Sequence, residues 1–127
     1  MTKKEEAKAY HDKGFNCAQS VALPFCEELG MPKQAAMKAL EGFGAGMGDR
    51  MQTCGALSGA VFVAGLKHSD GNLEAPASKA ATYAICGKVC QAFKEPCGST
   101  VCKEIKELSH LSCGECIALG VELAEET

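Results

Sequence analysis

Cysteine is the residue type that dominates the chemistry available to this chain, with nine copies among 127 residues. Three of them share one position, directly after an Asn, Thr or Ser residue: Cys17, Cys54 and Cys113. Asn, Thr and Ser are preferred N-cap residues, because their side-chain oxygens accept hydrogen bonds from free backbone amides. Each thiol is therefore predicted at the start of a helix, where the amides and the helix dipole favour a thiolate. We expect the pKa of these thiols to lie below the free value of about 8.5.

Cys102 follows Ser99 and Thr100 closely, so it is predicted near a fourth helix start. Thiolates are both nucleophiles and metal ligands. Several of them gathered in an apolar interior would repel one another, and burying their charge is costly. A bound metal or cluster would neutralise them, and so would disulfide formation. Two kinds of chemistry, metal–sulfur and thiol–disulfide, are therefore open at this stage.

The remaining cysteines carry weaker signals. Cys26, Cys86 and Cys90 lie on apolar helical faces, where free cysteine packs as a small hydrophobic residue. The segment CGEC, from Cys113 to Cys116, is similar to a dithiol redox motif that opens a helix. No strand precedes it, as a thioredoxin-like context would require, and Cys116 can also be explained as a core residue.

The fold is predicted to be all-α. Alternating Val, Ile and Thr stretches are absent, aromatic residues make up only 6% of the chain, and Ala is abundant. We expect residues 1–127 to form a single compact domain, a bundle of about six or seven short helices with a glycine-rich loop. The predicted helices cover approximately residues 3–13, 17–30, 32–42, 54–68, 76–93, 100–108 and 113–126.

The glycine-rich segment FGAGMG, residues 43–48, lacks the context of a nucleotide-binding loop. No strand precedes it and no Lys-Ser or Lys-Thr pair follows it. We expect instead that Gly44, Gly46 or Gly48 adopts a positive φ and lets the backbone approach the thiols closely. Gly55 and Gly59, each followed by an alanine, predict close contacts between helices.

Charge and hydropathy exclude several functions. The net charge is -3 and no basic stripe is present, so a nucleic-acid partner is not expected. The first 13 residues are charged throughout, and the longest uncharged run, Met51–Leu66, is shorter than the roughly 20 residues of a membrane helix. We therefore expect a cytoplasmic protein with no membrane insertion. In that reducing compartment, metal binding or reactive thiols are favoured over structural disulfides.

Four stretches of the chain resemble the C_GCAxxG_C_C family of redox-active proteins. They are GFNCAQSV (14–21), FGAGMG with TCGALSGAV (43–61), GSTVCKEI (98–105) and CGECIALGVELAEE (113–126). The resemblance places the four defining cysteines at Cys17, Cys54, Cys102 and Cys113, the same four that lie near predicted helix starts. It also implies a relation to the iron–sulfur part of split-Soret cytochromes, and an origin in anaerobes, often beside redox or transporter genes. No histidine follows a Cys-x-x-Cys pair, so no haem is expected.

These observations lead to one main hypothesis and several alternatives. The main hypothesis is an iron–sulfur cluster bound by Cys17, Cys54, Cys102 and Cys113, which serves electron transfer or redox sensing with a redox partner protein. The alternatives are a metal-free thiol–disulfide oxidoreductase, a closed structural zinc site and a metal-handling protein that serves a transporter. Whether the protein is an enzyme stays open, and so does homodimer formation. The extra cysteines leave ligand choice open: Cys26, Cys86, Cys90, Cys97 and Cys116.

Overall fold

A computed structural model describes residues 1–127, and all its regular elements are helical. In chain order they are α1 (Lys3–Asp12), α2 (Cys17–Cys26), α3 (Lys33–Ala39), the 3-10 helix η1 (Glu41–Phe43), α4 (Gly44–Met47), α5 (Gly55–His68), α6 (Lys79–Cys97), α7 (Cys102–Leu108) and α8 (Cys113–Glu126). The all-α prediction is confirmed. The expected number of six or seven helices is slightly wrong, because the glycine-rich segment contains the short helix α4.

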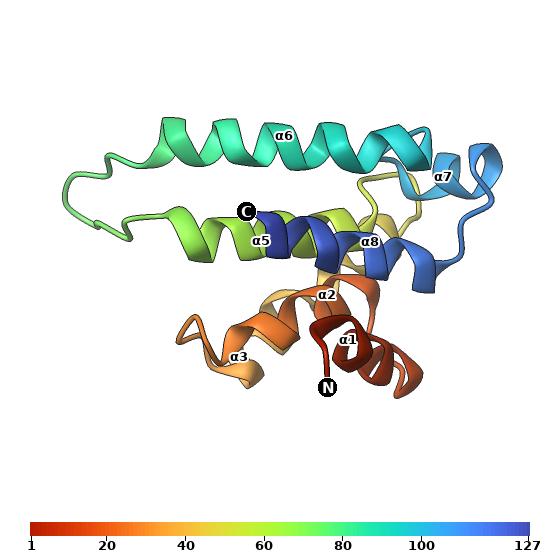
Figure 1. Ribbon diagram of the computed structural model, residues 1–127, viewed down its shortest axis with the longest axis horizontal. Helices are drawn as coiled ribbons and strands as arrows, with labels where there is room; N and C mark the ends of the chain where they lie inside the picture. Colours follow the sequence, from red (N-terminus) through yellow and green to blue (C-terminus); the bar gives the residue numbers. More distant parts are fainter.

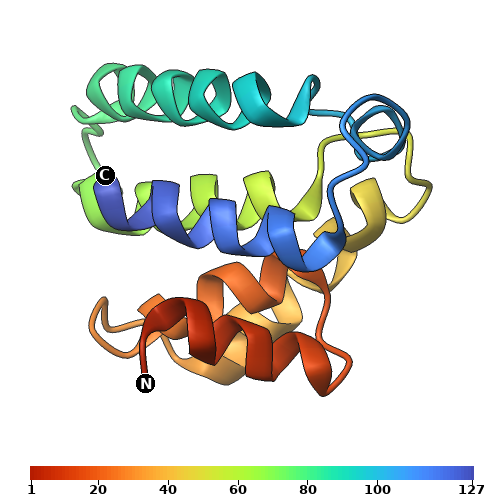
Figure 2. The ribbon, with the colours of Figure 1, turned by 45° about the vertical axis from the view of Figure 1, so that its right-hand side comes forward.

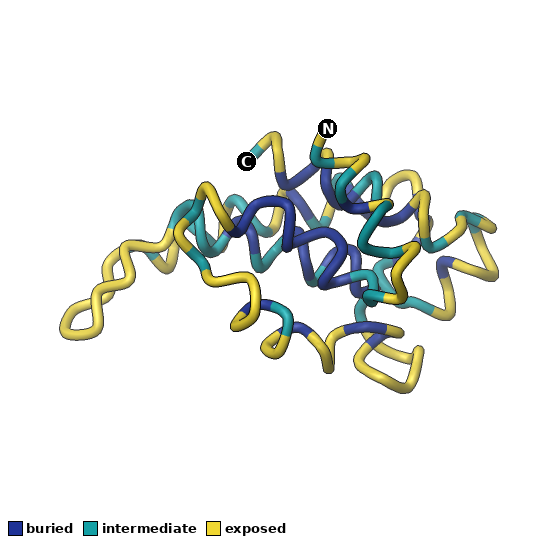
Figure 3. The backbone as a smooth tube through the Cα atoms, turned by 90° about the horizontal axis from the view of Figure 1, so that it is seen from below, coloured by how far each residue is buried: buried dark blue, intermediate teal, exposed yellow.

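The helices stack in layers (Figure 1). Helices α5 and α8 lie in the middle, the long helix α6 lies along one side of them, and α1, α2 and α3 lie on the other side. Helix α2 is the most deeply placed, because every residue from Ala18 to Cys26 is buried. Only Val89, Phe93 and Cys97 of α6 are fully buried, so this helix contributes one edge to the core (Figure 3).

Small residues set the spacing of the central helices. A Cβ added at Gly59 would lie 2.7 Å from the carbonyl oxygen of Ala18, and one added at Gly120 would lie 2.7 Å from the carbonyl oxygen of Ala56. Helices α2, α5 and α8 therefore approach one another backbone to backbone. The predicted close packing at Gly59 is confirmed, and a Cβ at Gly55 would also be crowded, 3.1 Å from the nearest atom. None of the helices combines the length and apolar character needed to span a membrane.

The long helix predicted over residues 76–93 begins later and ends later than expected, at Lys79 and Cys97. Helix α6 continues through Pro96 and ends at Cys97, where Gly98 takes the left-handed conformation with φ 77°. The amide of Gly98 donates to the carbonyl of Lys94 over 2.7 Å and closes the last turn. Burial of Phe93 and Cys97 in the core offsets the hydrogen bond that Pro96 cannot donate.

Candidate functional site

One end of the bundle contains a cavity of about 700 Å³ that is lined by cysteines. The cysteines are Cys17, Cys54, Cys102, Cys113 and Cys116. The structure therefore brings together the four residues that the sequence singled out, and it adds a fifth. Figure 2 shows the start of α8, helix α7 and the glycine-rich segment gathered at this end of the molecule.

Two of the thiols are placed by capping boxes at helix starts. Cys17 is the first residue of α2, and the Asn16 side chain accepts a hydrogen bond from the backbone amide three residues on. Cys113 is the first residue of α8, and Ser112 caps that helix in the same way. In each case a side chain in the first turn returns a bond to the N-cap amide. The N-cap predictions for Asn16 and Ser112 are confirmed.

Cys54 and Cys102 are positioned by a β-bridge and not by capping boxes. Thr53 pairs with Val101 in an isolated antiparallel bridge. The predicted role of Thr53 as an N-cap is therefore wrong: Cys54 itself holds the cap position, and α5 begins at Gly55. Cys54 has φ −55° and ψ 133°, outside the helical region, so the helix cannot begin before Gly55. Cys102 is the first residue of α7, close to the predicted helix start.

Two backbone hydrogen bonds flank the bridge and fix these helix starts beside each other. The amide of Cys54 donates to the carbonyl oxygen of Thr100 over 2.8 Å, and the amide of Cys102 donates to the carbonyl oxygen of Gln52 over 2.9 Å. The positions of Cys54 and Cys102 are thus coupled, although they lie far apart in the sequence.

The glycine-rich segment wraps over this side of the cavity in an unusual backbone conformation. Residues 45–48 are left-handed at four consecutive positions, with φ values of 51°, 57°, 62° and 88°. The positive φ predicted for the loop is confirmed at Gly46 and Gly48. Ala45 and Met47 adopt the same conformation despite their side chains, at a cost of roughly 1–2 kcal/mol each. Such strain is typical of functional sites.

Burial and thiol crowding control the electrostatics of the cavity. Burial, with the nearby thiols of Cys113 and Cys54, raises the pKa of Cys17 to about 12. The pKa of Cys54 is raised above its ordinary range, mainly by interaction with the Cys116 thiol and secondly by burial. Burial also raises the pKa of Cys102. The expectation of a lowered pKa is therefore wrong for Cys17 and Cys54, because burial and neighbouring thiols outweigh the helix ends.

Two cations act in the opposite direction and favour the thiolate form of the cysteines. The Lys106 Nζ donates a hydrogen bond to the Cys113 Sγ over 3.2 Å. Its charge also acts to lower the pKa of Cys17 and of Cys102. Arg50, which lines the same cavity, acts on Cys102 in the same direction. Part of any negative charge on the thiols is therefore balanced within the chain.

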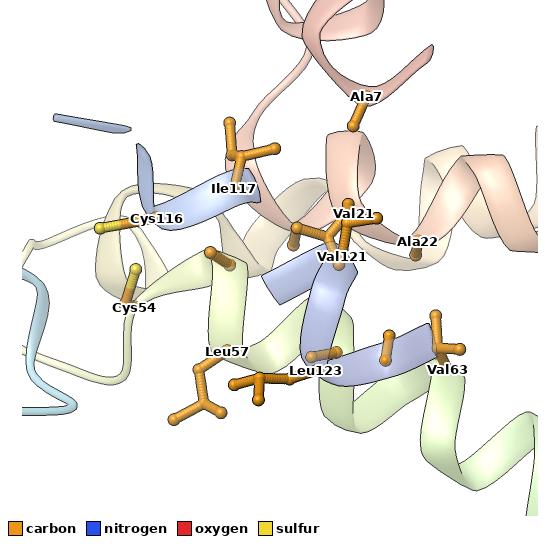
Figure 4. Close-up of a cluster of buried hydrophobic side chains, with 14 of the residues drawn as sticks. Ala7, Val21, Ala22, Cys54, Leu57, Val63, Cys116, Ile117, Val121 and Leu123 are labelled. Carbon is orange, nitrogen blue, oxygen red and sulfur yellow. The ribbon is translucent and has the colours of Figure 1, made fainter. Parts of the chain in front are cut away.

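Cys116 is the cysteine that the helix-start argument missed. It lies in the first turns of α8, and Figure 4 shows its side chain beside that of Cys54 at the edge of the apolar core. The only sequence signal was its place in CGEC, three residues after Cys113. Cys97 lies behind them, fully buried, where it also interacts with Cys116. The buried cysteines of this region are thus Cys54, Cys97 and Cys116.

The other three cysteines lie outside the cavity. Cys26 is buried in α2 and its thiol donates to the Ala22 carbonyl over 3.4 Å, which confirms the expected core role. Cys86 and Cys90 are half-buried on α6, one helical turn apart. The expected core role is confirmed only in part for these two cysteines, because only one side of α6 packs against the core and neither cysteine is fully buried.

The thiol interactions join two small groups. Cys17 interacts with Cys113, and Cys116 interacts with both Cys54 and Cys97. All nine cysteines are free, and no group of three or more His, Cys, Asp or Glu side chains is arranged as a metal site. The donor chemistry nevertheless suits soft metals, because several thiols from four helices border one cavity. Holding a metal or cluster would require these side chains to come closer together.

The fold and the cavity define a small all-helical, cysteine-rich protein. The chain matches the family described as "Putative redox-active protein (C_GCAxxG_C_C)" over residues 15–127, and it therefore belongs to that family. No curated protein and no solved structure matches the chain.

Proposed function

We propose that this protein binds an iron–sulfur cluster through Cys17, Cys54, Cys102 and Cys113 and exchanges electrons with a redox partner protein, in electron transfer or redox sensing. The observation that supports the proposal best is the convergence of these four cysteines on one cavity. They begin or cap four different helices, so local packing alone does not account for their meeting.

The electrostatics of the cavity favour occupation by cations. Crowding and burial keep thiols such as Cys17 protonated, because several neighbouring thiolates would repel one another. Iron ions would remove that repulsion, and binding would release the thiol protons. When bound, the cluster would supply one-electron exchange, at a potential set by nearby charges and hydrogen bonds to sulfur. The residues of the chain hold the sulfurs in place and balance their charge.

A second candidate is thiol–disulfide exchange, and the pairwise contacts of the thiols favour it. Cys17 with Cys113, or Cys54 with Cys116, could reduce a substrate disulfide. Two S–H bonds of the protein would break, one S–S bond would form between them, and two electrons and two protons would pass to the substrate sulfurs. This function needs only one pair and no metal.

Cys102 distinguishes the two candidates, because its thiol lines the cavity but belongs to neither pair. The test is anaerobic reconstitution of the apo protein with iron and sulfide, followed by absorbance spectra and analysis of bound iron and sulfide. We expect a brown protein whose iron content falls to background in C102S and is retained in C86S, a control outside the cavity. Disulfide reductase activity, if present, should survive C102S.

Two results would contradict the proposal. Failure of the wild-type protein to bind iron and sulfide would reject a cluster. Full cluster content in C102S would reject the proposed ligand set. Zinc binding without colour, at one ion per chain, would instead support the structural-site alternative.

A further inference from the structure

The cavity extends well beyond its cysteines. Past the thiols it is bordered by the glycine-rich turn and by helix α7, two segments that Figure 2 shows at the same end of the bundle. Its volume of about 700 Å³ lies within the range of about 300–1,000 Å³ that is usual for small-molecule pockets in proteins. The part beside the turn and α7, called the rim below, therefore has room for a small organic molecule.

The charged side chains of the cavity gather on this rim. Three of them are cations, Arg50, Lys103 and Lys106, and two are carboxylates, Asp49 and Glu107. The rim therefore carries a net positive charge, although the whole chain carries a net charge of -3. A cleft lined by one sign of charge raises the local concentration of ligands with the opposite sign. The charge of the rim thus favours an anionic ligand.

The two carboxylates do not neutralise all three cations. The Lys103 Nζ lies 4.0 Å from the Glu107 Oε1, so these two charges are paired. The Asp49 carboxylate instead accepts a hydrogen bond from the backbone amide two residues on, over 2.8 Å. Arg50 and Lys106 take part in none of the salt bridges of the chain. Two cations without a carboxylate partner therefore border the cavity.

The backbone of Arg50 is held firmly in a strained conformation. Its φ of 66° is left-handed, which costs a residue with a side chain roughly 1–2 kcal/mol. Two hydrogen bonds maintain it: the amide of Arg50 donates to the Ala45 carbonyl oxygen over 2.8 Å, and the Arg50 carbonyl oxygen accepts from the amide of Lys103 over 2.9 Å. The second bond joins the turn to the start of α7. Strain that the surrounding structure maintains at a cavity is typical of ligand-binding positions.

The ammonium group of Lys106 is also fixed, with one donor to spare. Its Nζ donates to the Leu111 carbonyl oxygen over 3.2 Å and to the Cys113 Sγ over 3.2 Å. An ammonium group has three N–H donors, so one stays available to a ligand. A second positive donor is therefore positioned between the rim and the thiols.

We propose that the cavity binds a small organic anion, and that Arg50 recognises its carboxylate or phosphate group with Lys106 as the second cation. The planar guanidinium group presents paired N–H donors that match the two oxygens of such a group. The rest of the molecule then faces the thiols. This binding concerns the apo protein and needs no cluster. For the thiol–disulfide candidate it also names the substrate class, an anionic low-molecular-weight disulfide, and that clause alone rests on the proposed function.

Two disulfide probes of different charge test the proposal in reduced, metal-free protein at neutral pH. Dithiobis(nitrobenzoate) carries two carboxylates, whereas dithiodipyridine is uncharged. With either probe a protein thiol gives up its proton, the S–S bond of the probe breaks, and one half joins the protein as a mixed disulfide while the other leaves with the electron pair. Peptide mass spectrometry gives the rates at Cys102 and Cys113. The ratio of the anionic to the neutral rate cancels changes in thiol reactivity and reports recognition of the carboxylate.

We expect R50Q to lower this ratio by about three- to fivefold, the scale of an exposed ion pair. K106Q should lower it as well, and R50K should lower it less than R50Q, because lysine keeps the charge but loses the paired donors. The matched control is K103Q, which removes a positive charge from the same rim but one that is paired with Glu107. Its ratio should stay near that of the wild type. Inorganic phosphate, compared with chloride at equal ionic strength, should slow the anionic probe in the wild type and not in R50Q.

Three results would overturn the proposal. An unchanged ratio in R50Q, with circular dichroism showing a folded protein, would remove the role of Arg50. Equal falls in R50Q and K103Q would show that only the general field of the rim acts on the probe. Equal inhibition by phosphate in wild type and R50Q would place the anion elsewhere. None of these outcomes depends on iron, so failure of the wild type to take up a cluster rejects the proposed function and leaves this test intact.

Discussion

Gly46 lies so close to Cys102 that a Cβ at residue 46 would be 2.7 Å from the Cβ of Cys102. The same glycine has a φ of 57°, inside the run of left-handed residues. A side chain at this position would meet both a steric clash and an unfavourable backbone conformation. The glycine-rich turn therefore packs directly against Cys102, the residue that begins α7.

The substitution G46A should accordingly destabilise the protein. We expect a loss of about 1–3 kcal/mol in the free energy of unfolding, from left-handed strain and contact with Cys102. The control is G87A, because Gly87 lies within α6 with no atom near an added Cβ. That variant should be more stable than the wild type by up to about 1 kcal/mol. Urea unfolding of the reduced apo protein measures both, and a G46A variant as stable as the wild type would contradict the role of this contact.

The two capping boxes should differ in what they contribute to stability. The Asn16 side chain caps α2 and also donates to the carbonyl oxygens of Glu41, over 3.0 Å, and Leu40, over 3.3 Å. Ser112 only caps α8. We expect S112A to cost about 1 kcal/mol and N16A about 2–3 kcal/mol, because N16A also removes the two hydrogen bonds to the carbonyls of Leu40 and Glu41. Equal losses in urea unfolding would show that the bonds to residues 40 and 41 contribute little.

The raised pKa of Cys17 predicts an alkaline loss of stability in the apo protein. The unfolded thiol ionises near pH 9, whereas burial and the neighbouring thiols hold the folded thiol protonated up to about pH 12. Above pH 9 the unfolded state therefore binds fewer protons than the folded state, and stability falls as the pH rises from about 9 to 12, by at most about 1.4 kcal/mol per pH unit. C17S should show a shallower decline than the wild type, and C86S serves as the control. Parallel declines in wild type and C17S would contradict the assignment.

Mild oxidation should reveal the thiol pairs. We expect two equivalents of diamide, a two-electron thiol oxidant that forms one disulfide per molecule, to link Cys17 to Cys113 and Cys54 to Cys116 in the metal-free protein, because these thiols are neighbours. Peptide mapping without reduction identifies the links, and Cys26, buried in α2, should stay free. A dominant link within CGEC would instead indicate that this segment acts as a dithiol motif by itself.

Much of the site could be predicted from the sequence because helix capping is local. An N-cap side chain bonds to amides only three residues away, so Asn16 and Ser112 predict two helix starts. The positions of Cys17 and Cys113 as first helical residues follow from these caps. The helical fold followed from composition in the same way. Thr53 shows the limit of such reasoning, since its pairing with Val101 depends on a segment almost fifty residues away.

The tertiary structure alone decided which thiols are neighbours and what their pKa values become. The sequence grouped Cys113 with Cys116, but the packing of α2, α5 and α8 directs Cys113 towards Cys17 and Cys116 towards Cys54. It also reversed the expected pKa shift of Cys17. Desolvation and repulsion between charges depend on burial and on distances in space, whereas a helix start is encoded within a few residues.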